Sequence, residues 1–337
     1  MLRLRRLSGA KVSRPCLGTR PARFRKPRLL IVGCGDIGLR VVECLGCLKL
    51  VGSHQKSAES NQTINPRRLI IRALTSSTHK VTKLRSLGVT PLLGNLDNAS
   101  SLKRLAGVAT HIIHLAPPAA TEGEMRDLRT RRLAQALLCA RSPKPVLVYG
   151  STSAVYGNAN GAKVTESSPV KARMPRALRR IDAEQTLRQY GKMAKARVVV
   201  MRIPGIYAPN REGGTPRNRL LKGLPVLQRN DDVYTSHIHA DDLARGLCLA
   251  LWRGASQRSY NINDDTELLM GDYVDLAADL YGLPRPPRVN RQEARTLLSP
   301  MQLSFMQDSR RLSNARLKQE LRLRLRYPTV STGLLSG

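Results

Sequence analysis

Hydrophobic residues along the chain gather into short runs that alternate with longer segments of helical spacing. Apolar runs of four to eight residues, bounded by Gly, Pro or polar residues, have the length of buried strands. They cover Leu29–Val32, Leu69–Leu74, Val89–Leu93, Thr110–Ala116, Pro145–Tyr149 and Ala196–Ile203. Helices are predicted from Ile37 onward and over Glu122–Ala140, Pro175–Tyr190, Asp241–Trp252 and Gly271–Tyr281. This order predicts an α/β fold, a Rossmann-type doubly wound parallel sheet with helices on both faces.

The pattern loosens after residue 203, where Gly, Pro and Asn interrupt the chain. We therefore expect a basic, disordered leader over 1–27, a sheet domain over 28–203 and a smaller C-terminal lobe. The lobe comprises 204–232 and 263–337, and residues 233–262 return to the sheet domain. Residues 52–66 are predicted to form a polar loop before the second strand, and the basic tail Arg310–Leu325 a helix.

Positive charge is in large excess, with a net charge of +33 for 337 residues. The first 28 residues hold ten Lys or Arg, no acid and no apolar core of the secretory kind. A cytoplasmic protein is the expectation, although the same composition fits an organelle transit peptide. No apolar run approaches the ~18 residues of a membrane span, so no membrane partner is predicted. The basic surface would attract phosphates, but aromatic residues make up only 4% of the chain, which makes nucleic acid an unlikely partner.

Gly33, Gly35 and Gly38 form a G-x-G-x-x-G pattern between the first predicted strand and the first predicted helix. In a dinucleotide-binding loop the first glycine permits the tight turn, the second lets the backbone approach a pyrophosphate, and the third lets helix and strand pack closely. The helix N-terminus adds free N–H groups. We therefore predict that this loop, including Asp36 and Ile37, binds a dinucleotide; the alternative is a tight turn with no ligand.

The end of the second strand bears on which dinucleotide is bound. NAD sites usually place an acidic residue there, which accepts a hydrogen bond from the ribose 2′-OH. Here the strand runs into Thr75, Ser76, Ser77 and Thr78 and then Lys80, with no acid nearby. Hydroxyls and a cation suit a 2′-phosphate, so NADP(H) is favoured over NAD(H), with Thr75 and Ser76 as contacts; a plain surface turn is the alternative.

Several stretches, taken in order, resemble the extended short-chain dehydrogenase/reductases, which include nucleotide-sugar epimerases and dehydratases. "STSAVYG" (151–157) follows the fifth strand as the active-site strand end of that family does. "GNLDNASSL" (94–102), "HLAPPA" (114–119), "MRIPGIYAPNR" (201–211) and "SHIHADDLARGL" (236–247) are similar to its other landmarks. The resemblance covers residues 28–330 and implies a nucleotide-binding sheet domain with a small substrate lobe.

The resemblance also implies which further residues hold the cofactor and which carry the chemistry. The additional cofactor-binding positions are Asn95, Leu96, Leu115, Ala116, Pro117, Ser151 and Arg180. Of the family's Ser or Thr, Tyr and Lys set, the first falls on Thr152, whereas the Tyr-x-x-x-Lys positions fall on Arg176 and Arg180. Arginine stays protonated in proteins and cannot exchange a proton as a phenol does. The closest fit is the atypical branch of the family, which keeps the glycine loop without that pair.

Other side chains are candidates for the missing acid or base. Tyr156 and Tyr207 are predicted to lie near the cleft, each with a packing role as the alternative. Arg176 and Arg180 lie four residues apart, so they share a helix face that either clamps a phosphate or an anionic substrate or is simply solvated. The H-x-H of His237 has no third ligand at a fixed spacing, so no metal is predicted.

We therefore predict an NAD(P)-binding short-chain dehydrogenase/reductase-like protein. It would be an oxidoreductase or an epimerase/dehydratase-like enzyme on a small, anionic substrate, and a monomer or homodimer. Two alternatives stay open. The missing Tyr/Lys pair motivates a non-catalytic NADP(H) sensor, and the net charge motivates a nucleic-acid-binding protein on a Rossmann scaffold.

Overall fold

The computed structural model describes residues 26–51, 69–119, 123–140 and 144–336, without the side chains of 47–51. The predicted leader up to residue 25 and the predicted polar loop 52–66 lie outside these ranges. No helix in the described ranges has the length and apolarity needed to cross a membrane.

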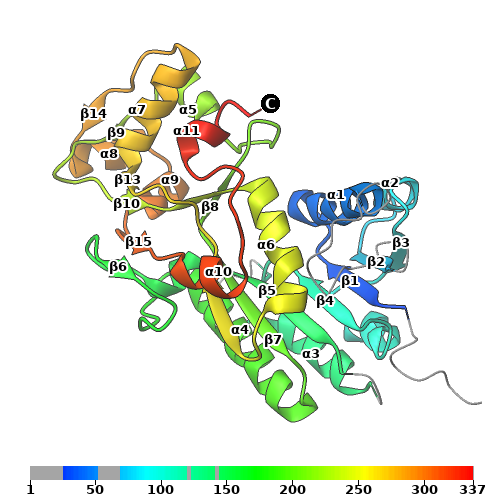
Figure 1. Ribbon diagram of the computed structural model, residues 1–337. Helices are drawn as coiled ribbons and strands as arrows, with labels where there is room; N and C mark the ends of the chain where they lie inside the picture. The colour runs from blue at the N-terminus through cyan, green and yellow to red at the C-terminus, as the bar shows by residue number, and fades with distance from the viewer. Residues whose placement is uncertain (1–25, 52–68, 120–122, 141–143, 337) are drawn as a thin grey trace, which may run out of the picture.

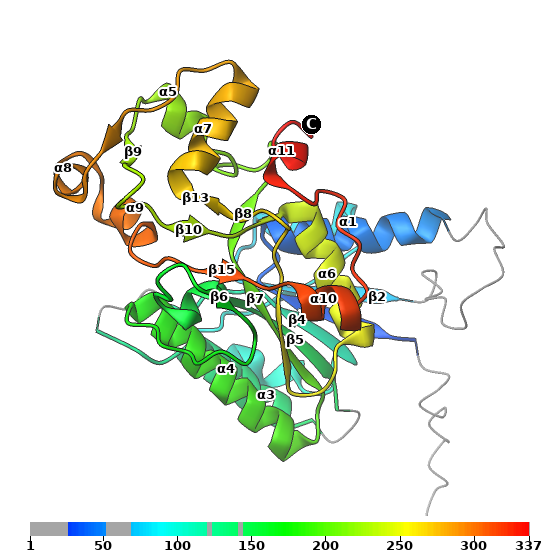
Figure 2. The same ribbon diagram turned by 60° about the vertical axis from the view of Figure 1, so that its left-hand side comes forward.

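A seven-stranded parallel sheet, in the order β12-β7-β5-β4-β1-β2-β3, occupies the centre of the described chain (Figures 1 and 2). Its strands are β1 Arg28–Val32, β2 Ile70–Thr75, β3 Thr90–Leu93, β4 His111–His114, β5 Val146–Thr152, β7 Val198–Ile203 and β12 Arg258–Asn261. The predicted fold class is confirmed. From β1 the chain runs outward through β2 and β3 and returns to β4 on the other side of β1. The strand order therefore reverses between β1 and β4, which opens a crevice at their carboxyl ends.

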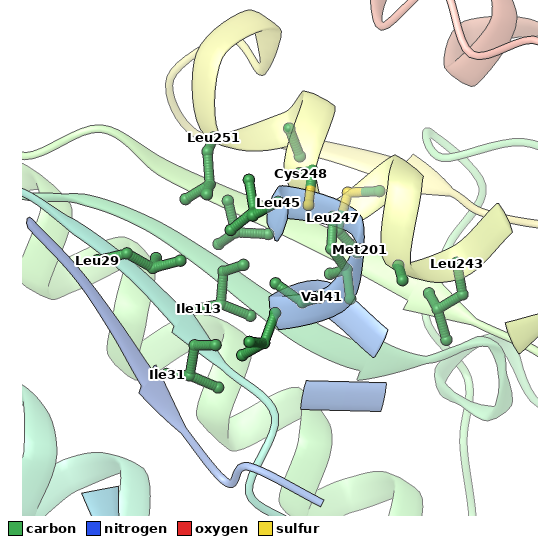
Figure 3. Packing of buried hydrophobic residues seen from close by; sticks show 14 of the residues in the cluster. Leu29, Ile31, Val41, Leu45, Ile113, Met201, Leu243, Leu247, Cys248 and Leu251 are labelled. Atoms are coloured by element: carbon green, nitrogen blue, oxygen red, sulfur yellow. The ribbon is translucent and has the colours of Figure 1, made fainter. Parts of the chain in front are cut away.

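Helices cover both faces of this sheet (Figures 1 and 2). α1 Asp36–Val51 and α6 Ala240–Arg253 pack on one face, and α3 Leu128–Leu138 and α4 Pro175–Ala194 on the other. Figure 3 shows the first layer, where Val41 and Leu45 of α1 meet Leu243 and Leu247 of α6 above the strands. Because both faces are buried, six of the seven strands are rich in apolar residues, which is why they stood out in the sequence, whereas β12, with the sequence RSYN, did not.

The remaining elements are short and lie beyond the carboxyl edge of the sheet or beside it. They include α2 Lys80–Ser86, η3 Ala99–Leu105, η4 Ser153–Tyr156, β6 Lys163–Val164, β8 Gly205–Tyr207, α5 Arg217–Leu221, β9 Val226–Leu227, β10 Tyr234–Thr235, β11 His237–His239, β13 Leu268–Leu269, α7 Met270–Tyr281, β14 Arg288–Val289, α8 Arg291–Leu297, α9 Pro300–Phe305, β15 Arg311–Leu312, α10 Ala315–Glu320 and α11 Val330–Gly333. Those around α5, α7, α8, α9 and α11 bury two apolar clusters of their own. They form the upper part of the molecule in Figure 2.

The predicted helix over Arg310–Leu325 was wrong. Only α10 is helical there; the preceding β15 instead pairs with β6 in a small parallel sheet. Soon after α10, Arg322 takes the left-handed backbone conformation at φ +54°, which ends any helical continuation.

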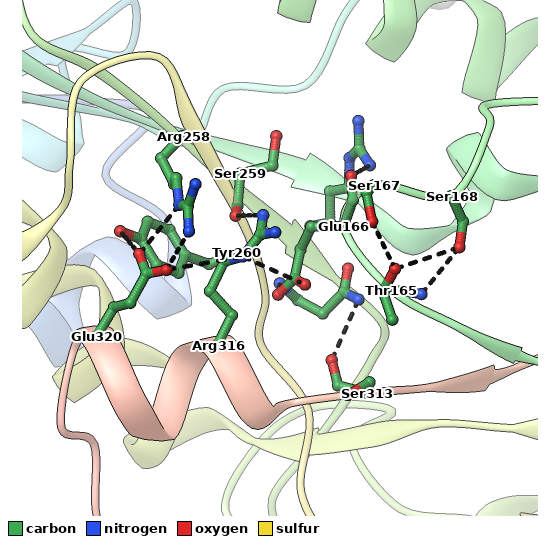
Figure 4. Close-up of polar contacts among 12 residues, drawn as sticks. Thr165, Glu166, Ser167, Ser168, Arg258, Ser259, Tyr260, Ser313, Arg316 and Glu320 are labelled. Atoms are coloured by element: carbon green, nitrogen blue, oxygen red, sulfur yellow. Dashed lines mark hydrogen bonds and ion pairs between the residues drawn. The ribbon is translucent and has the colours of Figure 1, made fainter.

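Carboxylates fasten this tail to the edge strand β12 (Figure 4). Glu320 of α10 accepts hydrogen bonds from Arg258 and, at 2.9 Å, from the Tyr260 hydroxyl. Glu166, which follows β6, accepts from the Asn261 backbone N–H at 2.9 Å, and its other oxygen lies 3.7 Å from Arg316 Nε of α10. The tail thus takes its shape from partners far away in sequence rather than from its own helical spacing.

Candidate functional site

The turn after β1 is built so that it closely approaches the chain leaving β4. Gly33 has φ +87°, and a Cβ placed on it would stand 2.4 Å from the Ala116 nitrogen. The Leu115 and Ala116 N–H groups both donate to the Val32 carbonyl, at 2.7 and 3.1 Å. The glycine loop and the segment beginning at Leu115 therefore line the two sides of the crevice where the strand order reverses.

The other two glycines have different surroundings. A Cβ on Gly35 would meet no atom within 4 Å, so bare backbone faces open space at the start of α1. A Cβ on Gly38 would lie 3.2 Å from Cys34 Sγ and 3.2 Å from the Gly33 carbonyl oxygen, so this glycine allows α1 to pack on the loop. Ile37 packs against the core. An open glycine backed by helix N–H groups fits a dinucleotide pyrophosphate.

Two arginines neutralise the only carboxylate of this loop. Asp36 accepts from Arg40 Nε at 3.1 Å and from Arg211 Nε at 2.9 Å. Arg40 is buried and also donates to Asn210, at 2.6 Å, and to Asp241 at the start of α6. The network ties the first turn of α1 to the loop after β8, and it offsets a negative charge where an anionic cofactor would approach.

The predicted contacts on the adenine side of the cofactor differ in whether a ligand could reach them. The Thr75 hydroxyl is occupied by its own turn, where it accepts from the Ser77 N–H at 3.1 Å, whereas Ser76 is exposed at the end of β2. Asn95 is exposed, and its side-chain oxygen accepts from the Asp97 N–H at 2.9 Å. Leu96 belongs to the buried core. Of these positions, Ser76 and Asn95 are the ones that a ligand could reach directly.

A cleft of about 530 Å³ lies at the carboxyl ends of β4, β5 and β7, between the sheet and the later elements. Pro117, Thr152 and Arg180 of the predicted site residues line this cleft, and the glycine loop does not. The other walls come from α4, from the β10–β11 segment and from the end of α9. Their residues include Arg176, Arg179, Gly205, Tyr234, His237, Phe305, Asp308 and Arg310.

The first turns of α4 bring arginines into the cleft at the positions where the family resemblance implies Tyr and Lys. The Arg176 guanidinium lies 4.5 Å from the centre of the Phe305 ring, within range of a cation–π contact. Arg180 Nη1 donates to the Tyr149 hydroxyl at 3.1 Å and to the Gly150 carbonyl at 2.8 Å, so it is anchored to the end of β5.

A further arginine enters from the C-terminal part of the chain. Arg310 Nη1 donates to the Gly157 carbonyl at 3.1 Å and lies 3.3 Å from Asp308. Burial lowers the pKa of Arg310, because a desolvated cation is costly, and Asp308 only partly offsets this. With Arg176, Arg179 and Arg180, four arginines and one acid line the cleft, so the cleft favours an anion.

Thr152 stands at the cleft, whereas its neighbour Ser151 points into the interior. The Thr152 Oγ1 accepts from the Ala154 N–H at 3.2 Å, which leaves the hydroxyl proton for a ligand. Ser151 is buried and donates to Glu184 at 2.6 Å. Glu184 forms a buried ion pair with Arg202 at 2.9 Å, so Ser151 completes an internal polar network rather than reaching a cofactor.

Neither tyrosine that we considered as an acid or base lines the cleft. The Tyr156 hydroxyl is buried, donates to Asn261 at 2.6 Å and accepts from Arg202 at 3.0 Å. Tyr207 is also buried and donates to the Thr329 carbonyl at 3.2 Å. Burial raises the pKa of both phenols, so neither is prepared to ionise. We do not retain them in the proposed site.

Sequence reasoning missed His237 and Tyr234 as parts of the cleft wall. The H-x-H pattern drew attention to His237 only as a possible metal ligand. The described residues contain no cluster of three or more His, Cys, Asp or Glu that could hold a metal ion. His237 is 8% exposed, and burial lowers its pKa to about 4.

A match to a family model shows which protein family the chain belongs to. The model described as the NAD dependent epimerase/dehydratase family matches residues 55–263, more than half of the chain. The chain belongs to this family. The match begins after the glycine loop, so the crevice geometry described above adds an independent observation. A search of curated proteins found no match.

Solved structures share this family fold over 91% of the chain. A conserved, functionally unknown protein from Silicibacter pomeroyi is 27% identical, with 96% of its chain covered and a TM-score of 0.68. The dTDP-glucose 4,6-dehydratase DesIV of Streptomyces venezuelae, as a double mutant with NAD and DAU bound, is 22% identical, with 94% covered and a TM-score of 0.68. A UDP-glucuronic acid 4-epimerase from Bacillus cereus, in complex with NAD, is 17% identical, with 93% covered and a TM-score of 0.66. At these identities the two enzymes support the fold alone.

Proposed function

We propose that this family member binds a nicotinamide dinucleotide across the β1/β4 crevice and acts as an oxidoreductase or epimerase-like enzyme on a small anionic substrate in the adjoining cleft. The observation that carries the proposal is Gly35, whose open backbone stands at the switch point of the sheet. The solved neighbours with bound NAD support the cofactor class. When bound, the nicotinamide would donate or accept a hydride.

The end of β2 supports NADP(H) in preference to NAD(H). No acidic residue occurs between Ile70 and Leu96, so nothing there would accept a hydrogen bond from a ribose 2′-OH. The exposed Ser76 hydroxyl and Lys80 ammonium offer a donor and a positive charge instead. A 2′-phosphate would be favoured by both.

The chain's own residues would divide the work on the substrate. The Thr152 hydroxyl, whose proton has no acceptor among the described residues, would donate to a substrate oxygen. Arg176 and Arg310 would bind its anionic group, because both line the cleft, Arg176 from α4 and Arg310 from the segment after α9. Residues 204–232 and 263–337 would form the substrate lobe, as the sequence predicts, with 233–262 belonging to the sheet domain.

A titration of the full chain with NADPH, followed by nicotinamide fluorescence, tests cofactor binding. Gly35→Val should raise the dissociation constant at least tenfold, about 1.4 kcal/mol, because the side chain would fill the space of the pyrophosphate. Gly46→Val is the matched control, since a Cβ at either glycine meets no atom within 4 Å. Saturable binding that is identical in wild type and Gly35→Val, or no binding by the wild type, would refute the proposed site.

The cofactor preference has its own test. Ser76→Asp places a carboxylate at the end of β2, where it would accept from a 2′-OH and repel a 2′-phosphate. We expect the ratio of NADPH to NADH affinity to fall at least tenfold, and Ser167→Asp, an exposed serine elsewhere, to leave it unchanged. An unchanged ratio in Ser76→Asp would show that the phosphate, if bound, is held elsewhere.

The arginines at the Tyr and Lys positions support a second candidate, a cofactor-binding sensor without turnover. The two are separated by incubating the wild type and Thr152→Val with NADPH and a panel of anionic carbonyl compounds. Consumption of NADPH that Thr152→Val loses, with cofactor affinity retained, supports the enzyme. Binding of NADPH without turnover of any compound supports the sensor.

A further inference from the structure

The structure brings a histidine to the carboxyl edge of the sheet, in the cleft that the proposed catalytic hydroxyl also lines. Thr152 of β5 pairs in register with Ile203 at the end of β7. Two residues later, Gly205 of β8 pairs in register with His237 of β11. Thr152, Gly205 and His237 all line the same cleft.

Aromatic packing fixes the His237 ring and decides which edge is open. Its ring centre lies 4.2 Å from that of Tyr273, at 32°, and 6.4 Å from that of Tyr207, edge-on. His237 Nδ1 is buried and has no hydrogen-bond partner among the described residues. A Cβ on Gly205 would lie 3.3 Å from His237 Cδ2 and 3.9 Å from Nε2. The absence of a side chain at Gly205 therefore leaves the Cδ2–Nε2 edge open to the cleft.

This environment selects one form of the imidazole. Burial lowers the pKa of His237 to about 4, so the ring is neutral at neutral pH and carries one N–H. A proton on Nδ1 would be a buried donor without a partner, which is costly, whereas a proton on Nε2 can be satisfied in the cleft. The ring is therefore a hydrogen-bond donor rather than a base.

We propose that His237 contacts the substrate directly, donating its Nε2–H to a carbonyl or anionic oxygen and so polarising that group. The proposal deepens the proposed function and rests on it. The family's phenol position is occupied by Arg176, and Tyr156 and Tyr207 are buried, so His237 would act as a second donor in the cleft that Thr152 lines. A neutral imidazole supplies one without a change of protonation state.

Nitrogen NMR on the full chain, labelled with ¹⁵N-histidine, tests the tautomer without any substrate. The chain has six histidines, so His237→Gln identifies the signal of His237 by its loss. We expect the proton on Nε2 across pH 6–8. A proton on Nδ1, or an imidazolium at neutral pH, overturns the proposal whether or not the cofactor binds.

Pyruvate, a minimal anionic carbonyl compound, then serves as the probe of contact in the presence of NADPH. Pyruvate should move the His237 Nε2 signal saturably, and His237→Leu should weaken its binding about tenfold. His237→Gln, which keeps an N–H near the position of Nε2, should lie within a few-fold of wild type, and exposed His79→Gln should match wild type. An unmoved Nε2 signal at the highest tolerated pyruvate concentration, or equal losses in His237→Leu and His237→Gln, refutes the contact. Failure of the proposed function shows separately, as absence of NADPH binding.

Discussion

The three glycines of the loop after β1 each have a different structural reason. Gly33 needs positive φ and leaves room for the backbone of Ala116, and Gly38 leaves room for Cys34. A Cβ on Gly35 would meet no atom of the described residues within 4 Å. The spacing in the sequence predicts the turn and the helix packing. That the neighbour of Gly33 is the chain after β4 could not be foreseen, because it depends on the strand order of the sheet.

This difference predicts a large effect on stability at Gly33 and a small one at Gly35. Gly33→Ala should destabilise the fold by about 3 kcal/mol, because its Cβ would stand 2.4 Å from the Ala116 nitrogen in a backbone conformation that disfavours side chains. Gly35→Ala should change the free energy of unfolding by less than ~1 kcal/mol. Urea denaturation of both variants measures this. Equal losses would mean that the loop is not packed against the chain after β4.

Asp264 is a second residue whose environment predicts a measurable effect. It is 1% exposed, and burial raises its pKa to about 8, while its Oδ1 accepts from the Thr266 N–H at 3.0 Å. Between pH 4 and pH 8 the unfolded chain has lost this proton and the folded chain keeps it, so stability falls as pH rises through that window.

Asp264→Asn removes this titration and keeps the oxygen that accepts from Thr266. The variant should therefore gain stability relative to wild type as pH rises from 4 to 8, with little difference at the acid end. Urea midpoints measured at several pH values across this window give the comparison. Parallel curves for the two proteins would show that Asp264 ionises normally in the fold.

At the level of elements, α1 and α6 are joined by a buried arginine as well as by apolar packing. The Arg40 side chain is 10% exposed and contacts Asp36 on its own helix and Asp241 on α6. It also holds Asn210 of the loop after β8. Removing the cation would take the arginine partner from Asp241 and leave Asp36 with Arg211 alone, in a partly buried place.

Arg40→Met should therefore destabilise the protein by about 3 kcal/mol. Arg85→Met, on an exposed position of α2, should stay within ~0.5 kcal/mol of wild type. Chemical denaturation compares the two. If Arg40→Met is as stable as Arg85→Met, the ion pairs of Arg40 do not stabilise the packing of α1 against α6.

Sequence alone located the elements whose signal is local and misjudged those shaped by distant partners. The six predicted strands are present with ends shifted by a few residues, since buried parallel strands are continuously apolar. The predicted helix over 122–140 begins only at Leu128, because the Asp127 side chain caps it by accepting from the Thr130 N–H. Tyr156 is directed inward by Asn261, 105 residues away, and no local pattern could reveal that.

At the scale of the whole molecule, the buried histidines and Asp264 change the stability of the fold with pH in opposite directions. Burial lowers the pKa of His111 and His237 to about 4 and that of His114 to about 3. Each is neutral when folded, and each binds a proton when unfolded once the pH falls below ~6.5. Their contribution to stability is complete above that pH and is lost as the pH falls toward 4.

The free energy of unfolding should therefore be greatest near neutral pH and fall more steeply on the acid side. Between pH 4 and 6.5 the unfolded state binds more protons than the folded state at His111, His114, His237 and His239 and fewer at Asp264, so the larger histidine contribution should make stability rise with pH. Above pH 6.5 the histidine contribution is complete and the Asp264 contribution still falls, so stability should decline gently toward pH 8. Urea unfolding at constant ionic strength measures both slopes. A flat profile between pH 4.5 and 6.5 would mean that these imidazoles reach water in the folded protein. The inference that His237 Nδ1 is buried and carries no proton would then lose its support.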